Sequence, residues 1–519
     1  MDEITSILFL VILGSLTILF FKMKPADKNT GKNLPPNLGQ NFVHKLLWLK
    51  VSLLTAGYAI KGFGTKLGPI VTAYFGPFPA IFVLDRNLIH EAFVKKGSAF
   101  SDRPLFSKNS ASAKFSSNGF IISFSRGKIL TLLRRNLTSQ ILNSSGTKSF
   151  SVHRKKIIGL LLRDLRGKAR NGGSDVGIIG LFRSSLFMLV SLMCFGKQDD
   201  DLVHDIEMNH RGLVDIFFKL NVFDFSPVLA KILYFKRWRS FTSMRKRQEE
   251  LYIPIIQKIR RRRDEQGIKE NSYIDTVLAL DIPVEDGTIR KPTDDEAVSL
   301  AHEFFTTGME TTITTIEWAM ANIIKHPHIQ KRLLDEINSV VPKEMATEDI
   351  EEDSLLNMPY LKAVIYETLR RHPPVETLLP HSNPQGDETI GPYHIPKGSM
   401  INAILDVGMD ENVWPDPNEF NPERFLMKKG QVVEFDENVA DITGTKREVK
   451  LIPFGLGRRL CPAIAMAMLH IRYYLACLVR EFEWKTAEGN DEVDLTHTYT
   501  FSIVMKNQLN ARVRLRNHT

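Results

Sequence analysis

The sequence predicts a mainly α-helical protein with small β-sheets, and three observations support this prediction. Long amphipathic segments dominate the middle and the end of the chain, as expected of helices that bury one face. Strand-like patterns are confined to short stretches, chiefly 68–85 and 388–404. Strands and helices do not alternate regularly, which argues against a doubly wound α/β fold. An uncharged apolar segment precedes this body and predicts a membrane anchor.

The composition is that of an ordinary globular protein of enzyme size. Of 519 residues, 43% are hydrophobic and 24% are charged. The net charge of +9 favours an acidic partner or an anionic membrane surface over nucleic acid. The three cysteines, Cys194, Cys461 and Cys477, lack paired spacing, which excludes a disulfide framework and indicates a reducing compartment.

The N-terminal segment from Ile4 to Phe21 contains no charged residue. Its 18 residues would form a helix of about 27 Å, close to the bilayer core of about 30 Å. Lysines follow it while acidic residues precede it, so the main body should be cytosolic. A cleaved signal peptide would carry its positive charge before the apolar run. We expect an anchor over residues 1–24, a basic, proline-containing linker over 25–42 and one large catalytic domain over 43–519.

The remaining elements follow along the chain. The stretch Gly68–Asp85 predicts two strands joined by a Gly-Pro turn, and short strands return at Glu388–Ile404. The charge run Lys258–Gly267 is expected on the solvated end of a helix. Prolines 373 and 374 should stop the second of three long helices. These helices are predicted at Asp295–His326, Met358–Pro374 and about Pro462–Glu483.

The segment PFGLGRRLCPAIAMAML places Cys461 between a basic turn and a helix. Pro462 suits the first position of that helix, so the thiol would lie at a helix N-terminus, which favours an anion. Two neighbouring arginines should lower its pKa further. The glycines permit a tight turn that could aim backbone amides at the sulfur. The residues concerned are Arg458, Arg459, Gly455 and Gly457.

Several interpretations of this cysteine compete. A buried core cysteine is the simplest. Zinc would lack ligands, because no second Cys or His stands nearby. A dinucleotide loop is excluded, since Leu460 stands where its third glycine is needed. An iron with one protein ligand and four porphyrin ligands fits a lone thiolate.

Four residues of this loop resemble the haem-binding loop of the cytochrome P450 family, F-x-x-G-x-R-x-C. They are Phe454, Gly457, Arg459 and Cys461. Other family motifs occur in the same order: E-x-x-R at Glu367 and Arg370, a third partner at Arg424, and TGMETT at Thr307–Thr312 in the long central helix. The resemblance covers essentially the whole chain, and finer features resemble plant microsomal family 89 and its neighbour family 77.

The resemblance implies a cytochrome P450 fold that binds haem b, with Cys461 as the axial ligand of the iron. Thr311 would hydrogen-bond the distal oxygen, and Glu310 would join the proton relay. The haem propionates would be bound by Arg459, Arg134 and His381. A buried triad would hold the loop under the haem, formed by Glu367, Arg370 and Arg424.

The central helix is unusually rich in threonine. Six of ten residues are threonine, and their hydroxyls can bond back to helix carbonyls and bend the helix. We expect a local opening beside the iron that admits O₂ and water. The alternative is a solvated threonine-rich face. The residues are Thr306, Thr307, Thr311, Thr312, Thr314 and Thr315.

The chain departs from the family pattern at several positions. Leu130 and Thr131 replace a usual Trp and Arg before Arg134, so one propionate hydrogen bond would be lost. Ala463 and Thr307 each replace a usual small residue, and Thr307 would lie near the iron. An apolar, aromatic substrate pocket is expected from Phe115–Phe124, Phe217–Phe225, Phe304, Thr307, Val375–Leu379 and Phe501–Val504.

These observations predict a haem-thiolate monooxygenase acting on a hydrophobic small molecule, with electrons from NADPH through a flavoprotein reductase. We expect a single-pass protein of the endoplasmic reticulum membrane with a cytosolic catalytic domain and no nucleic-acid partner. A docking face for the reductase is expected at Lys446, Arg447, Lys450 and Arg458. Two alternatives remain: an oxygen-independent rearrangement or dehydration on the same fold, and a non-catalytic haem- or lipid-binding protein.

Overall fold

The computed structural model describes most of the chain from residue 33 onward, and the chain forms two compact units. The described residues are 33–38, 60, 66–75, 78–104, 110–170, 173–220, 231–232, 234–267, 271–284, 286–375, 377–404, 406–429, 432–435 and 449–516. Each unit is built from three chain segments. The first unit comprises Met1–Leu105, Glu376–Val407 and Thr443–Leu460, and the second comprises Phe106–Val375, Gly408–Ile442 and Cys461–Thr519.

The first unit contains a four-stranded mixed sheet in the order β1-β2-β9-β6. The antiparallel pair β1 and β2, in register from Ile70 opposite Val83, confirms the two strands predicted within Gly68–Asp85. The strand β9 runs parallel to β2, and β6 pairs antiparallel with β9. The bounds are β1 Ile70–Phe75, β2 Phe78–Val83, β6 His381–Ser382 and β9 Met400–Ala403.

Short elements complete the first unit. Asp85 caps α4 by accepting from the backbone N–H groups of Asn87 and Leu88. The predicted strands within 388–404 are present as the β7–β8 hairpin and β9. The bounds are α4 Arg86–His90, η1 Glu91–Lys95, β7 Glu388–Ile390, β8 Tyr393–Ile395 and η8 Gly457–Arg459, with η6 Asp406–Met409 at the boundary of the units.

Residues 33–38, part of the predicted linker, lie against the sheet of the first unit. The backbone N–H of Thr72 donates to Pro36 O at 2.8 Å, and Leu38 donates back to Thr72 O at 2.9 Å. Pro35 is buried. The prolines make this segment extended, as expected, and its backbone pairs with the edge of β1. The predicted anchor, Ile4–Phe21, lies outside the described residues.

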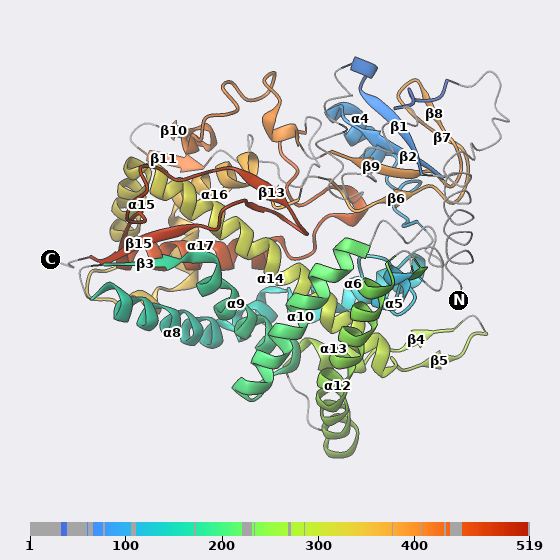
Figure 1. Ribbon diagram of the computed structural model, residues 1–519, viewed down its shortest axis with the longest axis horizontal. Coiled ribbons are helices and arrows are strands. Elements are labelled where there is room, and N and C mark those ends of the chain that lie inside the picture. The colour runs from blue at the N-terminus through green and yellow to red at the C-terminus, as the bar shows by residue number, and fades with distance from the viewer. Residues whose placement is uncertain are drawn as a thin grey trace, which may run out of the picture. The chain divides into compact units, whose positions relative to one another are not determined.

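The second unit is mainly helical (Figure 1). Its helices are α5 Ala111–Phe115, α6 Gly127–Asn136, η2 Leu137–Ile141, α7 Ser144–Ser149, α8 Ser151–Ala169, α9 Ile178–Phe195, α10 Asp200–Leu220, α12 Phe235–Gln266, α13 Tyr273–Leu278, α14 Asp294–Lys325, α15 Pro327–Val340, η4 Thr347–Asp349, η5 Glu352–Asn357, α16 Pro359–Arg371, η7 Pro422–Phe425 and α17 Ile464–Glu481.

Small antiparallel sheets accompany these helices. The largest in the second unit is three-stranded, in the order β12-β15-β3. The strands are β3 Ser174–Gly177, β4 Ile282–Pro283, β5 Ile289–Arg290, β10 Leu426–Lys429, β11 Val432–Phe435, β12 Phe482–Thr486, β13 His497–Tyr499, β14 Ile503–Met505 and β15 Asn510–Leu515. The predicted combination of many helices and small sheets is confirmed.

The helix α14 forms the centre of the second unit. It packs against α9, α12, α16 and α17 and is buried along most of its length (Figure 1). A capping box fixes its start, because the side chains of Thr293 and Glu296 each bond the other's backbone N–H. Trp318, fully buried, stacks on His372 with ring centroids 4.1 Å apart. Buried polar side chains also occur on this helix, and those of Glu303 and Asn322 are hydrogen-bonded.

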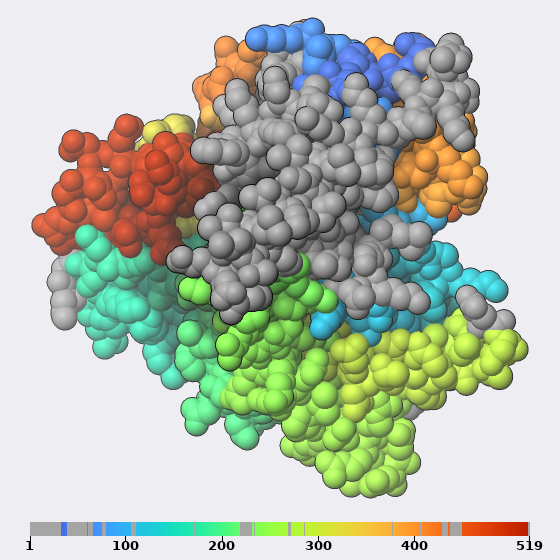
Figure 2. Space-filling view, turned by 45° about the vertical axis from the view of Figure 1, so that its right-hand side comes forward, coloured from blue at the N-terminus to red at the C-terminus, as the bar shows by residue number. Residues whose placement is uncertain are grey.

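Two other segments of the second unit are a charged helix end and a long apolar helix. The charge run Lys258–Gly267 lies on the last turns of α12, where Gly267 ends the helix with φ of 65°. Figure 2 shows the yellow-green residues of this region on the surface. The helix α9 is long and apolar enough to cross a membrane, but 67% of it is buried inside this unit, as in the core helix of a globular domain.

Candidate active site

The glycine turn, Pro453–Leu460, lies in the first unit and precedes Cys461. Gly455 and Gly457 both adopt positive φ, 72° and 66°. A β-carbon on Gly457 would overlap the carbonyl oxygen of Phe93 in η1. The turn therefore requires glycine at this position for its backbone conformation, as the sequence predicted, and also for close packing, which it did not indicate. Phe454 is half-buried within the same turn.

Arg459 and His381 both belong to the first unit. The Nε of Arg459 donates to Ser101 O at 2.8 Å. His381, on β6, is buried and lies edge-on to Phe93, with ring centroids 4.9 Å apart. Burial, reinforced by the positive charges of Arg103 and Arg459, lowers the pKa of His381 well below its usual range. The side chain expected to bind a propionate as a cation is therefore neutral here and could bind an anion only through an N–H.

Arg103 is a buried cation that the sequence did not reveal. Its Nη1 donates to Leu379 O at 2.7 Å and to Pro380 O at 3.0 Å, and lies 3.3 Å from Nδ1 of His381. Only 5% of this residue is exposed. Its partners lie more than 270 residues further along the chain, so no local pattern could have indicated the contact.

Cys461 opens the last segment of the second unit. The helix expected from Pro462 begins at Ile464, and Pro462 and Ala463 form a turn before it. The thiol accepts a hydrogen bond from the backbone N–H of Ala463, and the guanidinium of Arg134 is its cationic neighbour. Burial outweighs both and raises the pKa of the thiol. The sequence predicted that the helix N-terminus and nearby arginines lower this pKa, and in the structure desolvation is a larger opposing effect.

Arg134 occupies the last turn of α6 and is half-buried. Burial lowers the pKa of its guanidinium, and the nearby Cys461 opposes this shift. The two departures from the family pattern, Leu130 and Thr131, lie on the preceding turn. The hydroxyl of Thr131 donates to Gly127 O at 3.2 Å and is exposed.

All six threonines of α14 donate their hydroxyls to the carbonyl four residues earlier. The acceptors of Thr306, Thr307, Thr311, Thr312, Thr314 and Thr315 are respectively the carbonyls of His302, Glu303, Thr307, Gly308, Glu310 and Thr311, at 2.8 to 3.2 Å. The predicted back-bonding is present. The expected local opening is not, because α14 stays α-helical throughout and its carbonyls keep their backbone partners.

A short part of α14 is more exposed than the rest of the helix. Thr307 is exposed and Thr311, one turn later, is half-buried, whereas the following residues Thr312–Ile324 are buried. Glu310 forms an ion pair with Arg183 of α9, with Oε2 and Nη2 3.2 Å apart. Both side chains are largely buried. The carboxylate of Glu310, the residue before Thr311, is therefore held by the guanidinium of Arg183.

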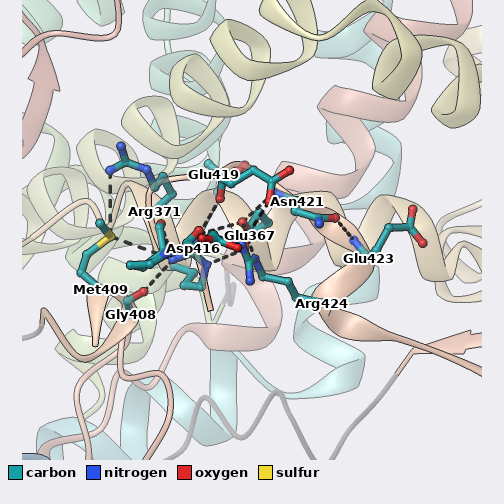
Figure 3. A network of polar contacts seen from close by, with 12 residues as sticks. Glu367, Arg371, Gly408, Met409, Asp416, Glu419, Asn421, Glu423 and Arg424 are labelled. Carbon is teal, nitrogen blue, oxygen red and sulfur yellow. Dashed lines mark hydrogen bonds and ion pairs between the residues drawn. The ribbon is translucent and has the colours of Figure 1, made fainter. Parts of the chain in front are cut away.

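Glu367 and Arg370 on α16 form a buried ion pair. Arg424 lies beside Glu367 (Figure 3). Arg370 binds both carboxylate oxygens, and its other N–H groups donate to the carbonyls of Gly408, Pro417 and Glu419 at 2.6 to 2.9 Å. The Nε of Arg424 lies 3.5 Å from Glu367. The structure thus brings together the three residues that the sequence grouped.

The expected pocket residues are only partly described. Phe115 stacks on Phe217, with centroids 3.9 Å apart, and both are buried in one apolar cluster. Phe304 stacks on Tyr273 at 4.7 Å. Residues 221–225, 446 and 447 lie outside the described part of the chain. Arg458 is exposed, and Lys450 is half-buried.

Cys461 could supply only one ligand to a metal ion. Among the described residues, no group of three or more His, Cys, Asp or Glu side chains could hold a metal ion. A lone thiol beside a backbone N–H and an arginine fits a metal whose remaining ligands come from a cofactor.

Comparisons with known proteins identify the family of the chain. The sequence model of the cytochrome P450 family matches residues 36–512. The chain is 37% identical to cytochrome P450 89A9 of Arabidopsis thaliana, over 98% of this chain and 99% of that protein. It is 30% identical to geraniol 8-hydroxylase of Catharanthus roseus, over 85% and 86% of the two chains.

The fold is also that of a solved relative. A zebrafish cytochrome P450 structure with progesterone superimposes with a TM-score of 0.72 at 18% identity, covering 88% of this chain and 99% of that chain. The chain therefore belongs to the cytochrome P450 family of enzymes, in which some relatives are named hydroxylases or monooxygenases.

Proposed function

We propose that Cys461 ligates haem iron and that the protein inserts one oxygen atom from O₂ into a hydrophobic small molecule. The single observation that carries this proposal is the placement of the Cys461 thiol, with the Ala463 N–H and Arg134 as its polar neighbours. Binding of a metal would release the proton that burial otherwise retains on the sulfur. Bound haem would supply the O₂ chemistry, and electrons would come from NADPH through a flavoprotein reductase.

Other residues would hold the cofactor. The glycine turn would support it through its backbone, with Phe454 and Gly457 as packing residues. Arg134 and Arg459 would bind the propionates as cations, and His381 would do so as a neutral donor. The cofactor would be haem b, which would be held in the protein only by the axial ligand and these contacts.

On α14, Thr311 would hold a proton at Oγ1, and Glu310 would supply its replacement. The hydroxyl of Thr311 now donates to Thr307 O, and Glu310 is paired with Arg183. The hydroxyl of Thr311 can rotate away from Thr307 O while the backbone hydrogen bonds of α14 stay in place, so Thr311 can act without the helix opening. Glu310 would have to leave Arg183 to carry a proton.

The substrate would be a hydrophobic plant metabolite. Relatives in plants are named geraniol 8-hydroxylase and flavonoid 3'-monooxygenase. Phe115, Phe217 and Phe304 supply apolar aromatic surface, and Thr307 adds an exposed hydroxyl on α14. We propose a ligand with few polar groups.

We also propose a cellular location and membrane attachment for the enzyme. Residues 1–24 would anchor it in the endoplasmic reticulum membrane in a single pass, 25–42 would link the anchor, and 43–519 would form the cytosolic catalytic domain. Lys446, Arg447, Lys450 and Arg458 would form the docking face for the acidic reductase.

The test is the Cys461→Ser variant together with isotope-labelled oxygen. Wild-type protein should bind haem and give the shifted Soret band of a thiolate-ligated carbon monoxide complex, and Cys461→Ser should not. Product formed under ¹⁸O₂ should carry one labelled atom. Unlabelled product would favour an oxygen-independent rearrangement, and haem uptake without any product would favour a binding protein.

A further inference from the structure

Glu303 lies on the same face of α14 as Thr307 and Thr311, one and two turns before them. Its side chain accepts two backbone hydrogen bonds from a distant segment, Ile122 N to Oε2 at 2.8 Å and Ser123 N to Oε1 at 2.7 Å. Only 7% of Glu303 is exposed. One carboxylate thus binds two consecutive amides that stand about 180 residues earlier in the chain.

The segment that Glu303 binds begins with an unfavourable bend. Ser117, Asn118 and Gly119 have successive φ values of 46°, 58° and 91°. Left-handed backbone is unfavourable for serine and only moderately tolerated by asparagine. The following turn is closed locally, since Ile121 O accepts from the backbone N–H of Ser125 at 2.7 Å. A compact turn entered through such a bend depends on outside contacts for its orientation.

This arrangement places the turn beside the accessible part of α14. Thr307 is exposed in an otherwise buried region, and its hydroxyl donates to the carbonyl of Glu303. The residue that binds the amides of Ile122 and Ser123 through its side chain therefore also accepts the hydroxyl of Thr307 through its backbone carbonyl. The same segment leads into α6, which carries Arg134.

We propose that Glu303 is a positioning residue that holds the segment Phe120–Ser125 against the Thr307 face of α14 and thereby restricts which substrates, in which orientation, reach it. This inference rests on the proposed function, because that function assigns the face to the substrate. Glu303 itself does not take part in the chemistry. Its contribution is the pair of hydrogen bonds that its carboxylate accepts from the amides of Ile122 and Ser123, here called the clamp.

Substitution by glutamine weakens the clamp without changing the size of the side chain. A glutamine oxygen can accept one of the two N–H groups, and its own NH₂ would face the other. Glu303→Asp keeps the charge and shortens the reach by one methylene. The two variants therefore lose the same contact by different means.

The chain contains a matched control in Glu336 of α15. Its carboxylate also accepts two consecutive backbone N–H groups, those of Tyr360 at 2.7 Å and Leu361 at 2.8 Å. These amides begin α16, so Glu336→Gln removes the same kind of contact without touching the segment 120–125. Any effect common to both variants reflects lost stability alone.

The first measurement is hydrogen exchange of the full-length protein. In Glu303→Gln and Glu303→Asp, exchange of the 120–125 peptide should rise about tenfold, as expected from the loss of a charge-assisted hydrogen bond. In Glu336→Gln the increase should appear in the first turn of α16 instead. Unchanged exchange of 120–125 in both Glu303 variants would overturn the clamp.

The second measurement uses the haem-loaded protein and two iron-binding probes, imidazole and the bulkier 4-phenylimidazole. The ratio of their dissociation constants should change in the Glu303 variants and stay at the wild-type value in Glu336→Gln. An unchanged ratio despite faster exchange would overturn the role in substrate placement. A wild-type protein that takes up no haem would refute the proposed function and this role with it, while exchange would still decide whether the clamp exists.

Discussion

Arg370 binds both carboxylate oxygens of Glu367, at 2.6 and 2.7 Å, and neither side chain is exposed. The remaining guanidinium N–H groups donate to three backbone carbonyls of the segment 408–419. A buried ion pair gains stability only when its other polar atoms are also bonded, and here they are. The pair thus ties α16 to the segment 408–419.

Replacing Arg370 by lysine should destabilise the fold by about 3–5 kcal/mol, because a single ammonium cannot replace the fork that serves Glu367 and the carbonyls together. Thermal unfolding and haem uptake measure the effect. The control is Arg247→Lys, which alters an exposed pair with Asp205 and should change stability by less than about 1 kcal/mol. Equal melting temperatures for the two variants would contradict a structural role for the buried pair.

The close approach of Gly457 to Phe93 makes a second prediction. Gly457→Ala would introduce a β-carbon into the Phe93 carbonyl at positive φ, so the glycine turn must shift. Gly398→Ala is the control, since φ is 77° there and a β-carbon meets nothing within 4 Å. The control should cost about 1–2 kcal/mol of stability and keep haem uptake. Gly457→Ala should lose haem uptake, as measured by the Soret absorbance of purified protein. Retention of normal haem content would show that the turn can relax.

The parts of this structure that could be predicted from sequence depend on local signals. Thr293 and Glu296 mark the start of α14, and Pro373 and Pro374 end α16, so their bounds agree with prediction within a few residues. The glycine turn was predictable because its residues are adjacent in sequence. Its glycine conformations are confirmed.

Other features depend on packing between distant segments and have no local signal. Arg103 and Glu303 bind partners 276 and 181 residues away, and neither contact changes the pattern of its own segment. The burial of Cys461, which raises the pKa of its thiol, could not be predicted, because burial is set by the whole unit whereas the neighbouring arginines are visible in sequence. The predicted opening of α14 failed since back-bonding threonines can coexist with an intact helix.

The buried carboxyl of Glu317 should make the stability of the fold depend on pH. It is 1% exposed, and burial raises the pKa of its carboxyl from 4.5 to about 7, against the opposing effects of the Leu509 N–H and Arg183. The unfolded chain releases this proton near pH 4.5, whereas the native state keeps it until about pH 7. The unfolded state therefore binds fewer protons over this interval, and stability should fall as the pH rises through it.

Glu317→Gln removes this effect. Relative to wild type, its free energy of unfolding should increase between pH 5 and pH 8 by on the order of 3 kcal/mol. Urea unfolding at the two pH values gives the difference. Glu492→Gln is the control, because that side chain is exposed and its pair with Lys325 should contribute little. A pH-independent difference between wild type and Glu317→Gln would mean that the buried carboxyl titrates normally.

Thr311 and Thr315 allow the proposed proton transfer to be separated from helix structure. Each hydroxyl donates to the carbonyl four residues earlier, at 3.0 and 2.8 Å, but Thr315 is buried and Thr311 is partly accessible beside Glu310. Valine keeps the branched shape and removes the hydroxyl, so both variants should fold and take up haem. Positioned proton transfer contributes about 10²–10⁴-fold to a rate. With a substrate identified by Soret titration, Thr311→Val should therefore yield at least about tenfold less product per NADPH consumed. Thr315→Val should keep the wild-type yield. Equal yields from both variants would place the proton donor elsewhere.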